Sequence, residues 1–72
     1  MIFMPLPAPF PGQKMWGARV GERSYLILQD GGMFTASTRT PGAATTYLIN
    51  FDESVSTRKE AENICIKHHS RS

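Results

Sequence analysis

The sequence predicts an α+β fold, in which a meander of three or four antiparallel strands carries a single C-terminal helix packed on one face. Two observations support this prediction. Between residues 15 and 51, four short runs of strand-forming residues are separated by turn signals, and a helix-capping motif then opens a run of helical period. The chain has 72 residues, enough for one domain with a thin core. Its single cysteine excludes a disulfide framework, so a partner is the simplest source of further stability.

Residues 1–13 are predicted to form a proline-rich extended N-terminal arm, and residues 14–72 a single sheet-plus-helix domain. Prolines at positions 5, 7, 9 and 11 restrict their own φ angles and disfavour helix in the residues before them. Alternate residues of this segment lack an amide proton, so the arm cannot form a central strand. The prolines recur at spacings of two, four or six positions, which excludes a P-x-x-P ligand motif because that motif needs a spacing of three.

The strands are predicted from alternating side chains and from β-forming residue types. They comprise residues 15–20, 24–29, 33–40 and 46–51. The first connection is a tight turn at Gly21 and Glu22, and the second is a hairpin turn at Asp30 and Gly31, where glycine supplies a positive φ. Residues 40–43 (TPGA) fit a type II turn, with proline and glycine at its two central positions.

The helix is marked by a capping box over residues 57–60 (TRKE). The Thr57 hydroxyl is expected to accept the Glu60 amide proton, and the Glu60 side chain to reach back to the start of the helix. The helix is predicted to run from Arg58 to about His68. Its buried stripe, at helical spacing, consists of Ala61, Ile64, Cys65 and His68.

The alternation assigns side chains to two faces of the sheet. The face expected beneath the helix carries Trp16, Ala18, Val20, Leu26, Leu28, Phe34, Ala36, Tyr47, Ile49 and Phe51. The open face is expected to carry Met15, Arg19, Tyr25, Ile27, Gln29, Met33, Thr35, Ser37 and Arg39. Methionine, tyrosine, isoleucine and arginine together on a solvent-facing surface favour contact with a partner. The predicted partner-binding residues are Arg19, Tyr25, Ile27 and Arg39, with Arg23, Met33, Lys59 and Lys67 as secondary candidates.

The nucleophilic and titratable residues form no recognisable catalytic motif. Cys65 and His69 stand one helical turn apart, a spacing that permits thiolate–imidazolium pairing, but Cys65 also lies on the apolar stripe and is expected to be a core residue. Four side chains suited to zinc lie close together in sequence: Glu62, Cys65, His68 and His69. A single helix cannot arrange them around one tetrahedral ion. The sequence therefore predicts a protein that is not an enzyme and that uses no cofactor or metal.

Charge and hydropathy limit the partners and the location. Eight Lys and Arg against six Asp and Glu give a net charge of +2, which is sparse for a dedicated nucleic-acid binder. No apolar run approaches the roughly 20 residues that a membrane helix needs. The apolar opening is broken by Pro5 and lacks the basic flank of a signal peptide. We therefore expect a cytoplasmic protein with no membrane partner.

A three-stranded sheet followed by a helix, over residues 15–69, resembles in topology the arm-type DNA-binding domains of phage integrases and the plant AP2 domain. Those domains place the sheet in the major groove of DNA. The resemblance implies that Arg19, Arg23 and Arg39 contact phosphates or guanines. A DNA-binding regulator is therefore the alternative functional prediction.

The favoured prediction is a small non-enzymatic protein that binds a larger protein. In size and style the chain resembles anti-CRISPR and other phage inhibitor proteins, and it reads as a complete small gene product. That resemblance implies an inhibitor in the host cytoplasm that docks on the surface of a larger host machine. The predicted partner is thus a larger protein or nucleoprotein complex, with nucleic acid and a second copy of the chain as alternatives. The third functional alternative is a structural component of a larger particle.

Overall fold

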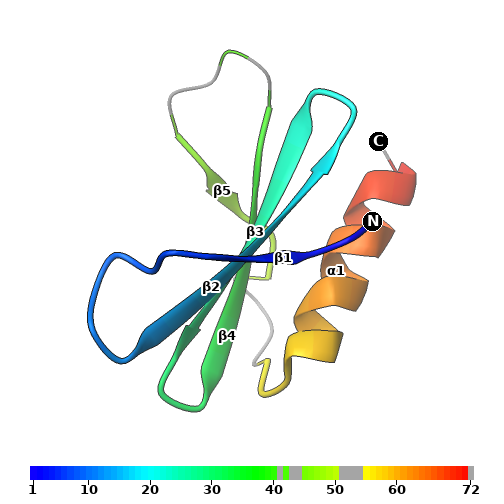
Figure 1. Cartoon of the computed structure of the whole chain (residues 1–72). Helices are drawn as coiled ribbons and strands as arrows, with labels where there is room; N and C mark the ends of the chain where they lie inside the picture. Colours follow the sequence, from blue (N-terminus) through cyan, green and yellow to red (C-terminus); the bar gives the residue numbers. More distant parts are fainter. Residues whose placement is uncertain (41, 43–44, 51–54, 72) are drawn as a thin grey trace.

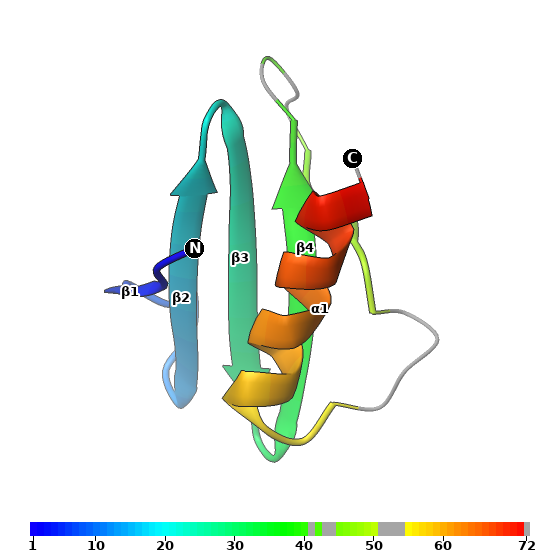
Figure 2. The same ribbon diagram turned by 90° about the vertical axis from the view of Figure 1, so that its right-hand side faces the viewer.

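The computed structural model describes residues 1–40, 42, 45–50 and 55–71, and it confirms the α+β class. Five antiparallel strands form one sheet in chain order, and one helix packs against it (Figure 1). Viewed from the helix side, α1 lies across β3 and β4 (Figure 2). The elements are β1 (Met4–Leu6), β2 (Gln13–Val20), β3 (Arg23–Asp30), β4 (Met33–Arg39), β5 (Tyr47–Leu48) and α1 (Arg58–Arg71). None of the helices in the described part of the chain is long and apolar enough to cross a membrane.

The three long strands match the predicted runs to within two residues at each end. The connection at Gly21 and Glu22 is confirmed, because β2 ends at Val20 and β3 begins three residues later. The second connection consists of Gly31 and the glycine after it, one residue later than predicted, since Asp30 is still paired within the sheet. Gly31 has a φ of +64°, the left-handed conformation that a tight hairpin turn requires.

The segment after β4 is less regular than predicted. The strand expected over residues 46–51 is confirmed only at Tyr47–Leu48, and Phe51 lies outside the described residues. The predicted turn over residues 40–43 also lies partly outside them. Gly42, which is described, has the positive φ (+76°) that the third position of a type II turn needs.

The proline-rich arm contributes the edge strand β1, which raises the number of strands to five. Met4, Pro5 and Leu6 pair with β2 opposite Gly17, Trp16 and Met15, respectively. Proline is tolerated here because an edge strand has a neighbour on one side only. Just before β1, Phe3 packs against the core. The arm is therefore part of the sheet.

The core lies between the helix and one face of the sheet. Its buried cluster consists of Tyr25, Ile27, Phe34, Ala36, Val55, Ala61 and Cys65. Trp16 packs against this cluster, with its ring stacked on that of Phe34 at a centroid distance of 6.2 Å. The predicted stripe of α1 is confirmed, since Ala61 and Cys65 are buried and Ile64 and His68 are half-buried.

The predicted orientation of β3 is wrong. Tyr25 and Ile27 are 0% exposed beneath the helix, whereas Leu26 and Leu28 face the other way. The reason is the register: the two-residue turn places Tyr25 opposite Ala18 and Ile27 opposite Trp16. Residues directly opposite in a sheet share a face, so all four point toward the helix. Gln29, also predicted on the open face, likewise lies on the helix side because it is opposite Phe34. Tyr47, predicted to be buried, is 58% exposed because β5 is a short outer strand.

The helix begins as predicted. The amide of Glu60 donates to the Thr57 hydroxyl oxygen at 3.2 Å, which confirms the capping motif. The Glu60 carboxylate accepts a hydrogen bond from the same hydroxyl at 3.0 Å rather than from a backbone amide. The helix continues three residues past His68, to Arg71.

Asn50, which the sequence analysis did not single out, completes the outer edge of β4. Its side chain is 6% exposed. The Ala36 amide donates to Asn50 Oδ1 at 2.9 Å, and Asn50 Nδ2 donates to the Phe34 carbonyl at 3.2 Å. Ile49 and Val55 add backbone bonds to the same two residues of β4. The asparagine amide thus replaces a neighbouring strand where β5 has already ended.

We expect Asn50→Ala to lower the free energy of unfolding by about 2 kcal/mol, because it leaves a buried amide and a buried carbonyl without partners. Urea denaturation followed by circular dichroism measures the change. Asn63→Ala, at an exposed position of α1, is the matched control and should not be destabilising. Equal urea midpoints for Asn50→Ala and the wild type would contradict this role.

Candidate functional site

The candidate site is the face of the sheet that α1 leaves uncovered. Because β2, β3 and β4 are paired in a continuous register, the side chains of this face form rows across the strands. One row runs Leu6, Met15, Leu28, Thr35, and the next runs Met4, Gly17, Leu26, Ser37. The five apolar side chains in these rows define the open-face patch: Met4, Leu6, Met15, Leu26 and Leu28.

Gly17 shapes this patch by the absence of a side chain. A Cβ atom at Gly17 would lie 2.5 Å from Leu6 Cδ1, so the Leu6 side chain lies over β2 in the space that a larger residue would share. A groove of about 340 Å³, predominantly apolar, follows this contact along the sheet. Ile2, Met4 and Leu6 line one side of it, and Gly17, Arg19 and Leu26 lie on the other. The three apolar side chains from the N-terminal segment remain well exposed, Ile2 at 78%, Met4 at 60% and Leu6 at 39%.

Arginines bound the patch at one end. Arg19 and Arg39 both lie opposite Ser24 on the neighbouring strands, so the three residues form the last row of the open face. Both arginine side chains are exposed. Together with Glu22 and Thr40 they line a shallow pocket of about 210 Å³. The structure therefore places Arg19 and Arg39 where they were predicted, on the open face.

The other predicted binding residues are dispersed. Tyr25 and Ile27 have no exposed surface and belong to the core, so they cannot contact a partner. Arg23 lies on the helix side of β3, and Met33 is exposed at the opposite end of the open face from the arginines. Lys59 and Lys67 are exposed on α1.

Sequence reasoning missed Leu26, Leu28, Met4 and Leu6 as surface residues of the site. A signal for the first two was present. Two-residue turns at both ends of β3 fix its register against both neighbours, and the register would have put the leucines on the open face.

Tyr25 links the sheet to the end of the helix. Its hydroxyl lies 3.0 Å from His68 Nδ1, and the two rings meet edge to face at 5.7 Å. Partial burial lowers the pKa of His68, and the positive charges of Arg23, Arg71 and His69 lower it further. The folded protein therefore favours the neutral imidazole, whose Nδ1 can accept a hydrogen bond from the Tyr25 hydroxyl.

Cys65 is confirmed as a core residue. It is fully buried on the helix face that meets the sheet, and burial together with the nearby Glu62 carboxylate raises its pKa to about 12. At neutral pH the group is a protonated thiol without access to solvent. Among the described residues, no three His, Cys, Asp or Glu side chains are grouped closely enough to hold a metal ion.

No family model matches the chain, and the comparisons with curated proteins and with solved structures find no match either. The open-face patch presents an apolar surface on the sheet, bounded at one end by arginines.

We predict that the protein loses stability as the pH falls below 6.5, the ordinary pKa of histidine. The pKa of His68 is lower in the folded state, so the unfolded chain binds a proton first as the pH falls. The contribution of His68 to the free energy of unfolding is therefore complete above pH 6.5 and is lost progressively below it. Urea unfolding at several pH values between about 8 and about 5.5 measures how the free energy of unfolding changes with pH. His68→Gln should flatten the pH dependence, while His69→Gln, which removes only the smallest cause of the lowered pKa, should keep most of it. A wild-type protein that becomes more stable across this interval would contradict the prediction.

Proposed function

We propose that the protein is a small non-enzymatic binding protein that docks on a larger protein through the open-face patch, and that it acts as an inhibitor by covering the surface it occupies. The observation that carries the proposal is the apolar character of a sheet face that the fold does not need for its own core. The core lies on the other face, between the sheet and α1.

The size of the face indicates how a partner would be bound. A stable protein interface buries about 800 Å² of the solvent-accessible surface of each partner. The whole chain exposes 5004 Å², and its dimensions are 30 × 22 × 20 Å. An interface of ordinary size would therefore engage most of the open face rather than a few residues of it. The half-buried Met15, Leu26 and Leu28 would form its centre, and Met4 and Leu6 would close it on the β1 side.

The side-chain types indicate the chemistry of the partner. Methionine and leucine side chains can pack against an apolar surface. Removing them from water stabilises the complex by about 25 cal/mol for each Å² of apolar surface buried. Arg19 and Arg39 stand at one end of the patch, so carboxylates on the partner would face them. The fitting partner is a protein surface with an apolar centre and an acidic margin on one side.

These features favour a protein over a DNA groove as the occupant of the open face. A sheet that reads the major groove needs polar side chains along its centre to hydrogen-bond the base edges. Here the centre is apolar, and only the last row, with Arg19, Ser24 and Arg39, is polar across three strands.

We expect Leu26→Asp to weaken partner binding at least about thirtyfold, because it places a charge in the apolar centre of the interface. Affinity capture from the source cells, with wild-type and variant proteins compared by mass spectrometry, identifies the partner, and calorimetry with the purified partner measures the loss. Met4→Gln, at an exposed edge position where the fold tolerates a polar group, should weaken binding in the same direction.

Ile66→Asp is the matched control, because Ile66 is an exposed apolar residue on α1, away from the open face. It should capture the same partner as the wild type. Retention of the partner by both Leu26→Asp and Met4→Gln, with the fold intact by circular dichroism, would refute the proposed docking face.

A further inference from the structure

Basic residues from distant parts of the sequence converge at one end of the molecule. The turn between β2 and β3, the end of β4 and the C-terminus of α1 lie together there (Figure 2). The contact between Tyr25 and His68 joins the strands to the helix at this end. We refer to it as the basic end, made up of Arg19, Arg23, Arg39, Lys67, His68, His69 and Arg71.

The basic end carries the net positive charge of the protein. It holds five of the eight Lys and Arg residues and both histidines. Within the described part of the chain, Glu22 is the only carboxylate at this end, and it lies on the pocket that Arg19 and Arg39 line. Among the described residues of the opposite end the charges balance: Lys14, Arg58 and Lys59 against Asp30, Glu60 and Glu62. The overall value of +2 therefore understates the local charge.

This arrangement is unfavourable for the isolated fold. Lys67 and Arg71 are like charges one helical turn apart, and no described carboxylate forms an ion pair with either of them. The helix dipole favours cations in its last turn, which accounts for part of the cluster. It does not account for Arg19 and Arg23, which lie on the strands. The same repulsion affects His68, because the positive charges of Arg23 and Arg71 help to lower its pKa.

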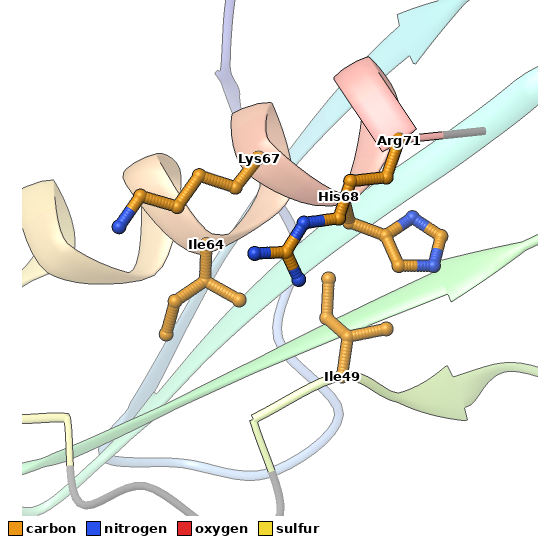
Figure 3. Close-up of a pocket in the computed structure, with 5 residues that line it drawn as sticks. All are labelled: Ile49, Ile64, Lys67, His68 and Arg71. Atoms are coloured by element: carbon orange, nitrogen blue, oxygen red, sulfur yellow. The ribbon is translucent and has the colours of Figure 1, made fainter.

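Two shallow pockets lie at this end, one on each side of the sheet. Figure 3 shows the pocket on the helix side, of about 210 Å³, where the Arg71 guanidinium extends over Ile49 and Ile64 while Lys67 extends along the helix. The pocket on the open side, also of about 210 Å³, pairs Arg19 with Arg39 and includes the hydroxyl residues Ser24 and Thr40. Arginine, lysine and hydroxyl side chains are the usual contacts of phosphate groups in nucleic acids.

We infer that the basic end binds the phosphate backbone of a nucleic acid. A chain of phosphates offers negative charge to several of these side chains at once, whereas a single small anion fills one pocket. Its polar side chains are of the types that contact phosphates, so we expect its binding to be independent of sequence and strongly dependent on salt. The basic end shares Arg19 and Arg39 with the margin of the open-face patch, whereas Lys67 and Arg71 on α1 belong to the basic end alone.

Fluorescence anisotropy with a labelled mixed-sequence duplex and its single strand, over a series of salt concentrations, tests the inference. The double variant Lys67→Gln/Arg71→Gln should bind at least about tenfold more weakly at low salt. For the duplex, the slope of log affinity against log salt should become shallower by about 0.9 for every phosphate that the variant no longer neutralises. The matched control is Lys14→Gln/Lys59→Gln, which removes the same charge from the opposite end and should leave both quantities unchanged.

Three results would overturn the inference. The first is no binding of either oligonucleotide by the wild type at low salt, and the second is an equal loss for the test and control variants. The third is competition by polyglutamate as effective as that by an unlabelled oligonucleotide, which would identify an acidic polypeptide as the ligand. Met4→Gln should bind the oligonucleotides like the wild type, so a failure at the basic end is distinguishable from a failure of the open-face patch.

Discussion

The register of three strands determines the rest of the structure. Two-residue connections at both ends of β3 place Arg23 opposite Val20 and Asp30 opposite Met33. Because side chains alternate along a strand, these two turns decide which residues of β3 face the helix. Tyr25 and Ile27 enter the core as a result, and the leucines between and beside them are left on the other face.

The candidate surfaces follow from this constraint. β3 is apolar on both faces, and a single helix can cover only one of them. The uncovered face gains Met4 and Leu6 from the arm, so the arm and the open face form one surface rather than two competing ones. The same register aligns Arg19 with Arg39, and the buried Tyr25 anchors the C-terminal turns of α1 beside them. An apolar face and a basic end thus share one rigid sheet.

Local signals in the sequence predict much of the fold, and long-range contacts account for most of what they miss. Turn glycines, strand composition and the Thr57 capping motif predict the three long strands, the helix and their order correctly, but they do not predict β1. The prediction for the faces of β3 is wrong because it places the two leucines on the face of Trp16 and Ala18, whereas the two-residue turns put Tyr25 and Ile27 there. The role of Asn50 depends on how the chain returns to β4, and the Tyr25–His68 contact joins residues 43 positions apart. Neither leaves a local pattern.

The orientation of β3 can be measured directly by thiol labelling of the native protein. Cys65 is buried with a raised pKa and provides a slow internal reference. A cysteine introduced by Leu26→Cys or Leu28→Cys should react with a soluble thiol reagent much faster than Cys65, whereas Ile27→Cys should be protected like Cys65. Faster reaction at Ile27→Cys than at Leu26→Cys would reverse the faces of β3 and remove the basis for the open-face patch.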